Sequence, residues 1–186
     1  GEITNKPYLK ILSKSKKTLI LSTGMSNHKE IDDALKLLNK KNIILMHCTS
    51  SYPTNFNEVN LNVISTFKKK YNFRIGYSDH TNGFEVPIAA VSLGAECIEK
   101  HITFNRNMSG PDHKASMNIK DFEKMISLIR NIEKAKGSYN KKLTKSEMLI
   151  KNVVRKSIFT KKSIKRGEIF TNDNLCIKRP GYGVSP

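Results

Sequence analysis

Apolar positions along residues 1–137 follow two alternating patterns. Short apolar runs of strand length occur four times, at 18–24, 42–49, 73–79 and 97–103. Each run is followed by a segment in which apolar residues recur at helical spacing, and these segments are 27–41, 58–71, 83–95 and 118–137. Because strands alternate with helices, the pattern predicts parallel strands joined by right-handed crossovers.

Two α/β architectures contain such units: an open doubly wound sheet and a (β/α)8 TIM barrel. No G-x-G-x-x-G motif follows the first apolar run, which argues against a nucleotide-binding open sheet. Polar residues cluster where the predicted strands end, as in the active sites of barrel enzymes. These residues are Ser22, Thr23, Thr49, Ser50, Tyr52, Ser78, His80, Glu99 and His101. Four units make half a barrel, so we expect residues 1–137 to form its C-terminal half.

The pattern changes after Gly137. Residues 138–154 are a polar linker with a helical tendency. Residues 155–186 alternate in short β-like pieces with a turn at Arg166-Gly167, which predicts the start of a small β-rich domain, truncated at Pro186.

Charge and hydropathy narrow the class of protein. The net charge is +17, but the excess is mostly lysine spread along the chain, with only six arginines. This pattern is typical of a solvated surface and favours attraction of anionic substrates over nucleic-acid binding. No run approaches the roughly 18 apolar residues that a membrane span needs, and the first residues are no signal peptide. Three separated cysteines form no C-x-x-C motif. The sequence indicates a soluble cytoplasmic protein without nucleic-acid or membrane partners.

Two histidines are candidate metal ligands. Residues i and i+2 of a strand share a face, so Ser78 points with His80, and Glu99 points with His101. Two imidazoles at the open end of adjacent barrel strands can converge on one metal ion and leave positions for water and substrate. Manganese, iron, cobalt and zinc all suit such ligands. The alternative is two separate, hydrogen-bonded histidines. The adjacent His47 and Cys48 face opposite sides, which excludes a catalytic dyad there.

Eight stretches of the chain together resemble the sialic acid synthase family, the N-acetylneuraminate and N,N'-diacetyllegionaminate synthases. They are "GEITN", "ILSTGM", "HCTSSYPT", "GYSDHT", "PIAAVSLGA", "IEKHIT", "GPDHKASM" and "IKRPGYGVSP". The resemblance implies a TIM barrel followed by a small antifreeze-like (SAF) domain. It also implies condensation of phosphoenolpyruvate with an N-acetylated amino sugar to a nonulosonic acid, with release of phosphate.

The resemblance also implies roles for individual residues. His80 and His101 match the metal ligands, usually of manganese. Ser22, Ser78 and the Thr49–Ser50 turn match phosphoenolpyruvate contacts, although some neuraminate synthases have asparagine in place of Ser50. Tyr52 and Asp112 match contacts with the amino sugar, and Glu2 matches a residue that reaches the reacting end of the sugar. Arg179 matches an arginine of the antifreeze-like domain that reaches the N-acetyl group. The resemblance implies a domain-swapped homodimer, in which this arginine comes from the other chain.

Several alternatives stay open at this point. The amino sugar is N-acetylmannosamine or its diacetamido-dideoxy analogue. A related phosphoenolpyruvate-dependent sugar-acid synthase of surface polysaccharide biosynthesis is a second enzyme class, and a non-catalytic basic binding protein is a third possibility. The family pattern has an essential lysine before the position of Gly1, so we expect residues 1–186 alone to be an inactive piece of a longer enzyme.

Overall fold

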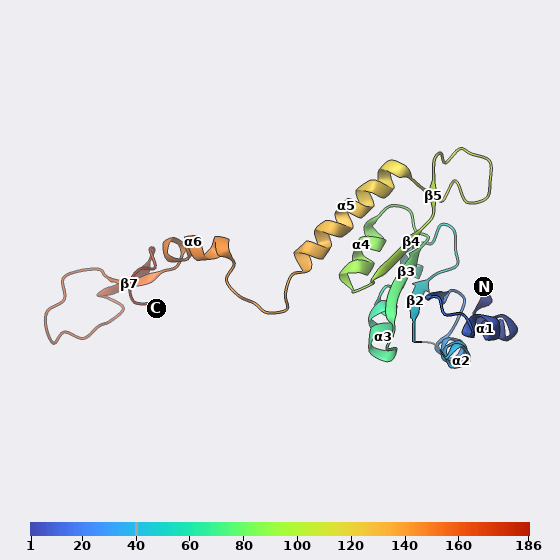
Figure 1. Cartoon of the computed structure of the whole chain (residues 1–186). Coiled ribbons are helices and arrows are strands. Elements are labelled where there is room, and N and C mark those ends of the chain that lie inside the picture. Colours follow the sequence, from blue (N-terminus) through green and yellow to red (C-terminus); the bar gives the residue numbers. More distant parts are fainter. Residues whose placement is uncertain (40) are drawn as a thin grey trace. The chain divides into compact units, whose positions relative to one another are not determined.

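The computed structural model describes residues 1–39 and 41–186. The chain divides into two compact units, Gly1–Gly137 and Ser138–Pro186 (Figure 1). The first unit contains a four-stranded and a two-stranded sheet, and the second contains a two-stranded sheet.

A parallel sheet forms the centre of the first unit. Its strands, in spatial order, are β1 (Leu19–Ser22), β2 (Ile43–Cys48), β3 (Arg74–Asp79) and β4 (Cys97–Lys100). The helices of this unit are α1 (Lys6–Ser13), α2 (His28–Leu38), α3 (Asn62–Lys70), α4 (Glu85–Ser92) and α5 (Ile119–Lys136). Short 3-10 helices are η1 (Glu2–Thr4) and η2 (Phe56–Glu58). The predicted alternation of strands and helices is confirmed, while α1 was not predicted.

Helix α2 begins and ends where its sequence provides caps. The Asn27 side chain accepts a hydrogen bond from the Glu30 amide at 3.0 Å, and the Glu30 carboxylate accepts one from the Asn27 amide at 2.8 Å. This capping box satisfies two amide groups of the first turn. The buried face consists of Ile31, Ala34 and Leu38. Asn39 ends the helix in the left-handed conformation, earlier than predicted, and Lys40, which the prediction included, lies outside the described residues.

The two faces of the four-stranded sheet differ in what covers them. Leu45, Ile75 and Tyr77 point to one face and join residues of α1, α2, α3 and α4 in one hydrophobic core. We call this the outer face. The alternate residues point to the inner face, where Ile20 is 50% exposed and Glu99 is also exposed. A doubly wound sheet would bury both faces under helices, so the one-sided cover indicates the curled wall of half a barrel.

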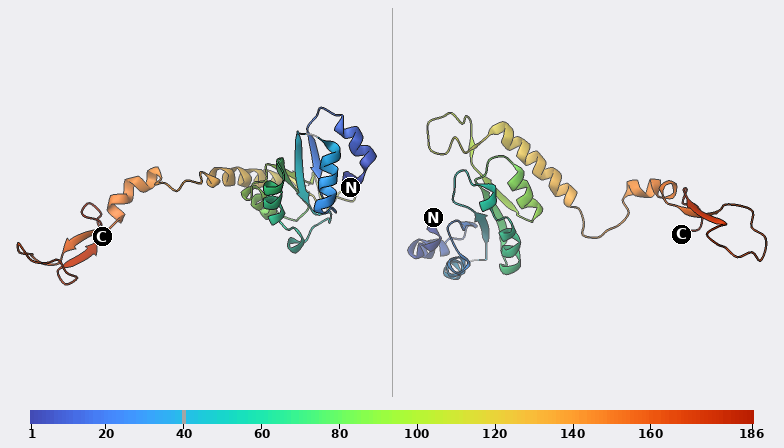
Figure 2. Two further views of the ribbon diagram at one scale, coloured as in Figure 1. Left: turned by 90° about the horizontal axis from the view of Figure 1, so that it is seen from below. Right: turned by 180° about the vertical axis from the view of Figure 1, so that it is seen from behind.

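The fourth predicted strand is interrupted at His101. Strand β4 ends at Lys100, and β5 (Ile102–Thr103) follows as a separate strand. Strand β5 pairs in parallel with β6 (Met117–Asn118), which was not predicted and overlaps the first residue of the helical segment predicted at 118–137. Helix α5 begins directly after β6 and packs along α4, as Figures 1 and 2 show. The interruption therefore places His101 between two strands at one end of the sheet.

The second unit consists of a helix and an antiparallel strand pair. Helix α6 (Lys145–Val154) begins with a capping box between Thr144 and Glu147. Strands β7 (Ser157–Thr160) and β8 (Leu175–Lys178) pair antiparallel. The helical tendency and the β-like pieces predicted here are thus observed, and assignment to an antifreeze-like domain stays a prediction.

The lengths and compositions of the helices show whether any of them could span a membrane. Across the described ranges, 1–39 and 41–186, no helix combines the length and apolar character needed to cross a bilayer.

Candidate functional site

The inner faces of β3 and β4 bring four polar side chains to one end of the sheet. Ser78 and Glu99 are direct neighbours in the register of the two strands. His80 and His101 each follow two residues later on the same face, and their ring centroids lie 5.5 Å apart. The predicted convergence of the two histidines is therefore observed.

His80 is held in one orientation by the main chain of the loop after β2. Its Nδ1 lies 2.7 Å from the Thr49 carbonyl oxygen, and the residue is 9% exposed. Because a carbonyl can only accept, Nδ1 carries the proton, and in a neutral ring Nε2 keeps its lone pair. Ser78 Oγ lies 3.4 Å from Nε2 but donates its proton to Glu99 Oε1 at 2.6 Å. The Nε2 lone pair is therefore available to a metal ion.

His101 completes a pair of imidazoles that fits one divalent ion. Its Nδ1 lies 3.8 Å from Asp112 Oδ2, beyond hydrogen-bond distance. Two imidazoles that bind one ion at about 2.1 Å place their ring centres roughly 5 Å apart, close to the observed separation. Among residues 1–39 and 41–186, no group of three or more histidine, cysteine or acidic side chains is placed to bind a metal. The two histidines would thus leave several ligand positions to water and substrate.

Tyr52 covers both histidines. Its ring centroid lies 4.1 Å from that of His80 and 5.4 Å from that of His101. Burial is the main cause that raises the pKa of the Tyr52 hydroxyl, and the nearby charges of Cys48, Asp112 and Glu99 add to the effect. The hydroxyl therefore stays protonated and can donate to a ligand at this end of the sheet.

Only some of the other predicted site residues contact the histidine pair. Within the part of the chain that the structure describes, hydrogen bonds, ion pairs and ring contacts join the histidine pair to Thr49, Tyr52, Ser78 and Asp112, but none joins it to Glu2, Ser22 or Ser50. Glu2 lies in η1 and accepts a hydrogen bond from Asn5 at 2.6 Å. Ser22 is exposed on β1, beside Met46. Arg179 lies in the second unit, where its Nε donates to the Val154 carbonyl oxygen at 2.8 Å.

The predicted cluster of hydroxyl groups is divided between two places. Thr49 and Ser50 line a cavity of about 720 Å³ at the C-terminal ends of β1 and β2, together with Thr23, Asn27, His28 and Asn60. The Thr49 hydroxyl donates to the Glu58 carbonyl oxygen at 3.2 Å, so Thr49 supports His80 through its main chain. Ser78 instead faces the histidines.

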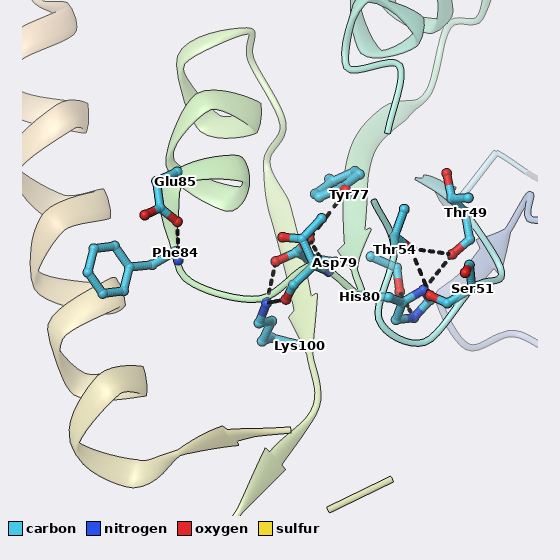
Figure 3. A network of polar contacts seen from close by, with 11 residues as sticks. Thr49, Ser51, Thr54, Tyr77, Asp79, His80, Phe84, Glu85 and Lys100 are labelled. Atoms are coloured by element: carbon cyan, nitrogen blue, oxygen red, sulfur yellow. Dashed lines mark hydrogen bonds and ion pairs between the residues drawn. The ribbon is translucent and has the colours of Figure 1, made fainter. Parts of the chain in front are cut away.

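Sequence reasoning missed one polar feature next to the site. Lys100 forms a buried ion pair with Asp79 on the outer face, one residue away from His101 and His80 (Figure 3). Asp79 also accepts hydrogen bonds from the amide and the hydroxyl of Thr81 and so supports the end of β3. Nothing in the sequence distinguished Lys100 from the many surface lysines.

Comparisons with known proteins identify the group to which this architecture belongs. The NeuB family model matches residues 1–141. N,N'-diacetyllegionaminic acid synthase of Campylobacter jejuni is 52% identical over the whole chain, and the protein of the same name from Legionella pneumophila is 38% identical. The chain covers 57% and 54% of these two relatives, so it spans about half their length.

A solved structure shares the fold. The N-acetylneuraminic acid synthetase of Leptospira borgpetersenii superposes with a TM-score of 0.74 at 40% identity, over 80% of this chain and 53% of that one. The family match covers most of the chain and includes both metal-ligand candidates. The chain belongs to the NeuB family, whose relatives include the sialic and legionaminic acid synthases.

Proposed function

We propose that the protein condenses phosphoenolpyruvate with an N-acetylated amino sugar, forms a nonulosonic acid and releases phosphate. The observation that carries this proposal is the His80–His101 pair, 5.5 Å apart with its ring nitrogens available, in a chain of the NeuB family. The proposal concerns the natural full-length protein, since the present chain spans about half the length of its relatives.

The diacetamido-dideoxy analogue of N-acetylmannosamine is the preferred sugar. The supporting observation is the 52% identity to a relative named N,N'-diacetyllegionaminic acid synthase. N-acetylmannosamine is the second candidate, supported by the 40% identity to a structure named N-acetylneuraminic acid synthetase.

Residues at the end of the sheet have complementary roles in this proposal. His80 and His101 would hold a divalent ion, with manganese as the proposed metal, whose Lewis acidity would be available to the aldehyde of the open-chain sugar. Ser78, Ser22 and the Thr49–Ser50 turn bind phosphoenolpyruvate. Tyr52 and Asp112, which lie beside the histidines, bind the amino sugar, and Glu2 approaches its reacting end.

The proposed reaction balances with one water molecule. The methylene carbon of phosphoenolpyruvate forms the new bond to the aldehyde carbon, whose oxygen becomes a hydroxyl. Water adds to the carbon that carries the phosphate, and the C–O bond to phosphate breaks to leave the keto acid. Placing the two substrates side by side supplies much of the rate enhancement of such a reaction.

Substitution of the histidines tests this function. In the natural full-length protein, His80→Ala and His101→Ala should each weaken manganese binding and reduce phosphate release by roughly a thousandfold, because the polarised carbonyl is worth several kcal/mol. Release of phosphate is measured with each of the two sugars. Lys29→Ala is the control, since Lys29 is exposed on α2 and pairs with Asp33. Wild-type rates in either histidine variant would contradict the proposal.

A domain-swapped homodimer is part of the proposal. The second unit begins with the polar residues 138–144, and Arg179 is exposed in it. We assign Arg179 to the N-acetyl group of a sugar bound by the other chain. Mixing inactive His80→Ala and Arg179→Ala proteins should restore activity, up to about a quarter of the wild-type rate if subunits exchange freely. A mixture that stays inactive after verified subunit exchange would place the contact within one chain.

A further inference from the structure

A buried ion pair lies directly behind the histidine pair. Asp79 and Lys100 are cross-strand neighbours on the outer faces of β3 and β4. Lys100 Nζ lies 2.5 Å from Asp79 Oδ2, and the two side chains are 3% and 0% exposed, respectively. Figure 3 shows the pair between the two strands, with Tyr77 beside it. The Tyr77 hydroxyl donates to Asp79 Oδ1 at 3.3 Å.

Lys100 binds the chain on both sides of His80. Its Nζ donates to Asp79 Oδ2 and also to the Thr81 carbonyl oxygen, each at 2.5 Å. The Thr81 amide and hydroxyl in turn donate to Asp79 Oδ1, at 3.0 and 2.9 Å. His80 lies between Asp79 and Thr81 in the sequence, and His101 directly follows Lys100. One ammonium group therefore connects the main chain that carries one imidazole to the main chain that carries the other.

The loop after β2 holds His80 from the opposite side. The Thr54 amide donates to the His80 carbonyl oxygen at 2.9 Å, and His80 Nδ1 donates to the Thr49 carbonyl oxygen at 2.7 Å. The ring orientation is thus set by the loop, as Figure 3 shows. The loop does not determine the position of His80 relative to β4. The contacts of Lys100 determine that position.

Stability alone is a poor explanation for this ion pair. Burying two charges carries a desolvation penalty that often exceeds their attraction, and apolar residues of similar size commonly replace such pairs without loss of stability. A metal site, in contrast, requires its ligands at fixed separation, and groups behind the ligands provide that precision.

We propose that Lys100 and Asp79 are positioning residues that fix the separation of His80 and His101 for metal binding. The inference rests on the metal role assigned to the histidines under the proposed function. It predicts that loss of the ion pair weakens metal binding even where the fold survives, because the bridge from Lys100 to Thr81 is lost.

The test compares three variants of the natural full-length protein. Lys100→Met removes the ammonium group but leaves the Asp79 charge buried. Asp79→Asn/Lys100→Met removes both charges. The amide oxygen that it introduces at position 79 would still accept hydrogen bonds from Thr81. The matched control is Arg74→Met/Glu96→Gln, which removes a half-exposed ion pair of 3.2 Å between the same two strands at their other ends. Manganese affinity is measured from the electron paramagnetic resonance signal of free Mn²⁺.

The double variant decides between positioning and stability. We expect it to fold, by circular dichroism, and to bind manganese roughly 10 to 100 times more weakly than wild type, as for other groups that support metal ligands. The control should bind within about twofold of wild type, because surface ion pairs contribute little. If the folded double variant binds manganese as tightly as wild type, the pair has no positioning role and the inference is wrong.

A second measurement is independent of the metal. Loss of the contact from Lys100 to the Thr81 carbonyl oxygen should loosen the chain around His80. Hydrogen exchange at the Thr54 amide, which donates to the His80 carbonyl oxygen, should therefore be faster in the double variant and unchanged in the control. Unchanged exchange in the double variant would overturn the inference. If wild type binds no manganese, the metal role in the proposed function fails, whereas the exchange rates still decide whether Lys100 fixes the chain around His80.

Discussion

Adjacent residues on β3 and β4 belong to two very different surfaces. On the outer face, Tyr77 and Asp79 are 1% and 0% exposed and lie among the residues packed by the helices. On the inner face, Ser78 and Glu99 form a hydrogen bond beside the two imidazoles. One strand segment thus packs the core with one set of side chains and, under the proposed function, supplies the chemistry with the other. Substitutions at neighbouring positions should therefore affect different properties.

Loss of packing on the outer face should have the largest effect on stability. Phe67 of α3 is 2% exposed and contacts the rings of His47 and Tyr71. Phe67→Ala should lower the free energy of unfolding by about 3–5 kcal/mol, through lost burial and the cavity left behind. Urea unfolding of the natural full-length protein measures this loss. Phe67→Leu, which keeps most of the volume, should lose much less, and equal losses would show that the site is not a packed core position.

A substitution on the inner face should affect activity more than stability. Ser78→Ala removes the hydrogen bond to the Glu99 carboxylate, which is exposed and can bind water instead. We expect the free energy of unfolding to change by only about 1 kcal/mol. Under the proposed function, in which the Ser78 hydroxyl exchanges its bond to Glu99 for one to phosphoenolpyruvate, phosphate release should fall at least tenfold. Steady-state kinetics and urea unfolding of one preparation check both parts. A large stability loss with an unchanged rate would make Ser78 a structural residue.

A smaller effect concerns pH and the outer face. Burial is the main cause that lowers the pKa of His47, whose Nε2 donates to the Val59 carbonyl oxygen at 2.7 Å. The neutral ring is therefore favoured in the folded state, so its contribution to stability is present above the unfolded pKa of about 6.5 and is lost as pH falls. His47→Gln should reduce the slope of stability against pH below that value, by at most about 1.4 kcal/mol per pH unit.

The pH prediction is checked by urea unfolding at several pH values between 7.5 and 5, a range chosen around the roughly 6.5 pKa of free histidine. His28→Gln, the same change at an exposed histidine, is measured alongside as the control. An identical slope in wild type and His47→Gln would show that His47 does not control acid stability.

The sequence predicted the strands and the convergence of His80 with His101 because both depend on local periodicity. A two-residue repeat determines which side chains share a face, and parallel strands place their ends together. Sequence reasoning failed where the structure depends on contacts of main-chain groups or on pairs of residues distant in sequence. Thr49 orients His80 through its carbonyl oxygen, a group that every residue has and that no sequence pattern marks. Helix α1 was missed because its apolar pattern is short. The signals that could have revealed it are the N-cap residue Asn5 and Pro7 in the first turn.

Lys100 was missed for a different reason. Lysine is common throughout this chain and is normally solvated. Its burial depends on Asp79, a residue 21 positions earlier, and on the register that places the two side by side. Neither the register nor the desolvation of the pair is visible in a local pattern.

The alternation of faces along β3 and β4 has a consequence for enzyme engineering. A combinatorial library that varies inner positions 97 and 99 and keeps Ser78 would sample new ligand preferences while the packed outer position between them stays constant. Such a library would tolerate many substitutions, because each variable codon is flanked by codons that maintain the fold. The same separation would let natural relatives diverge in the sugars they accept without rebuilding the barrel wall.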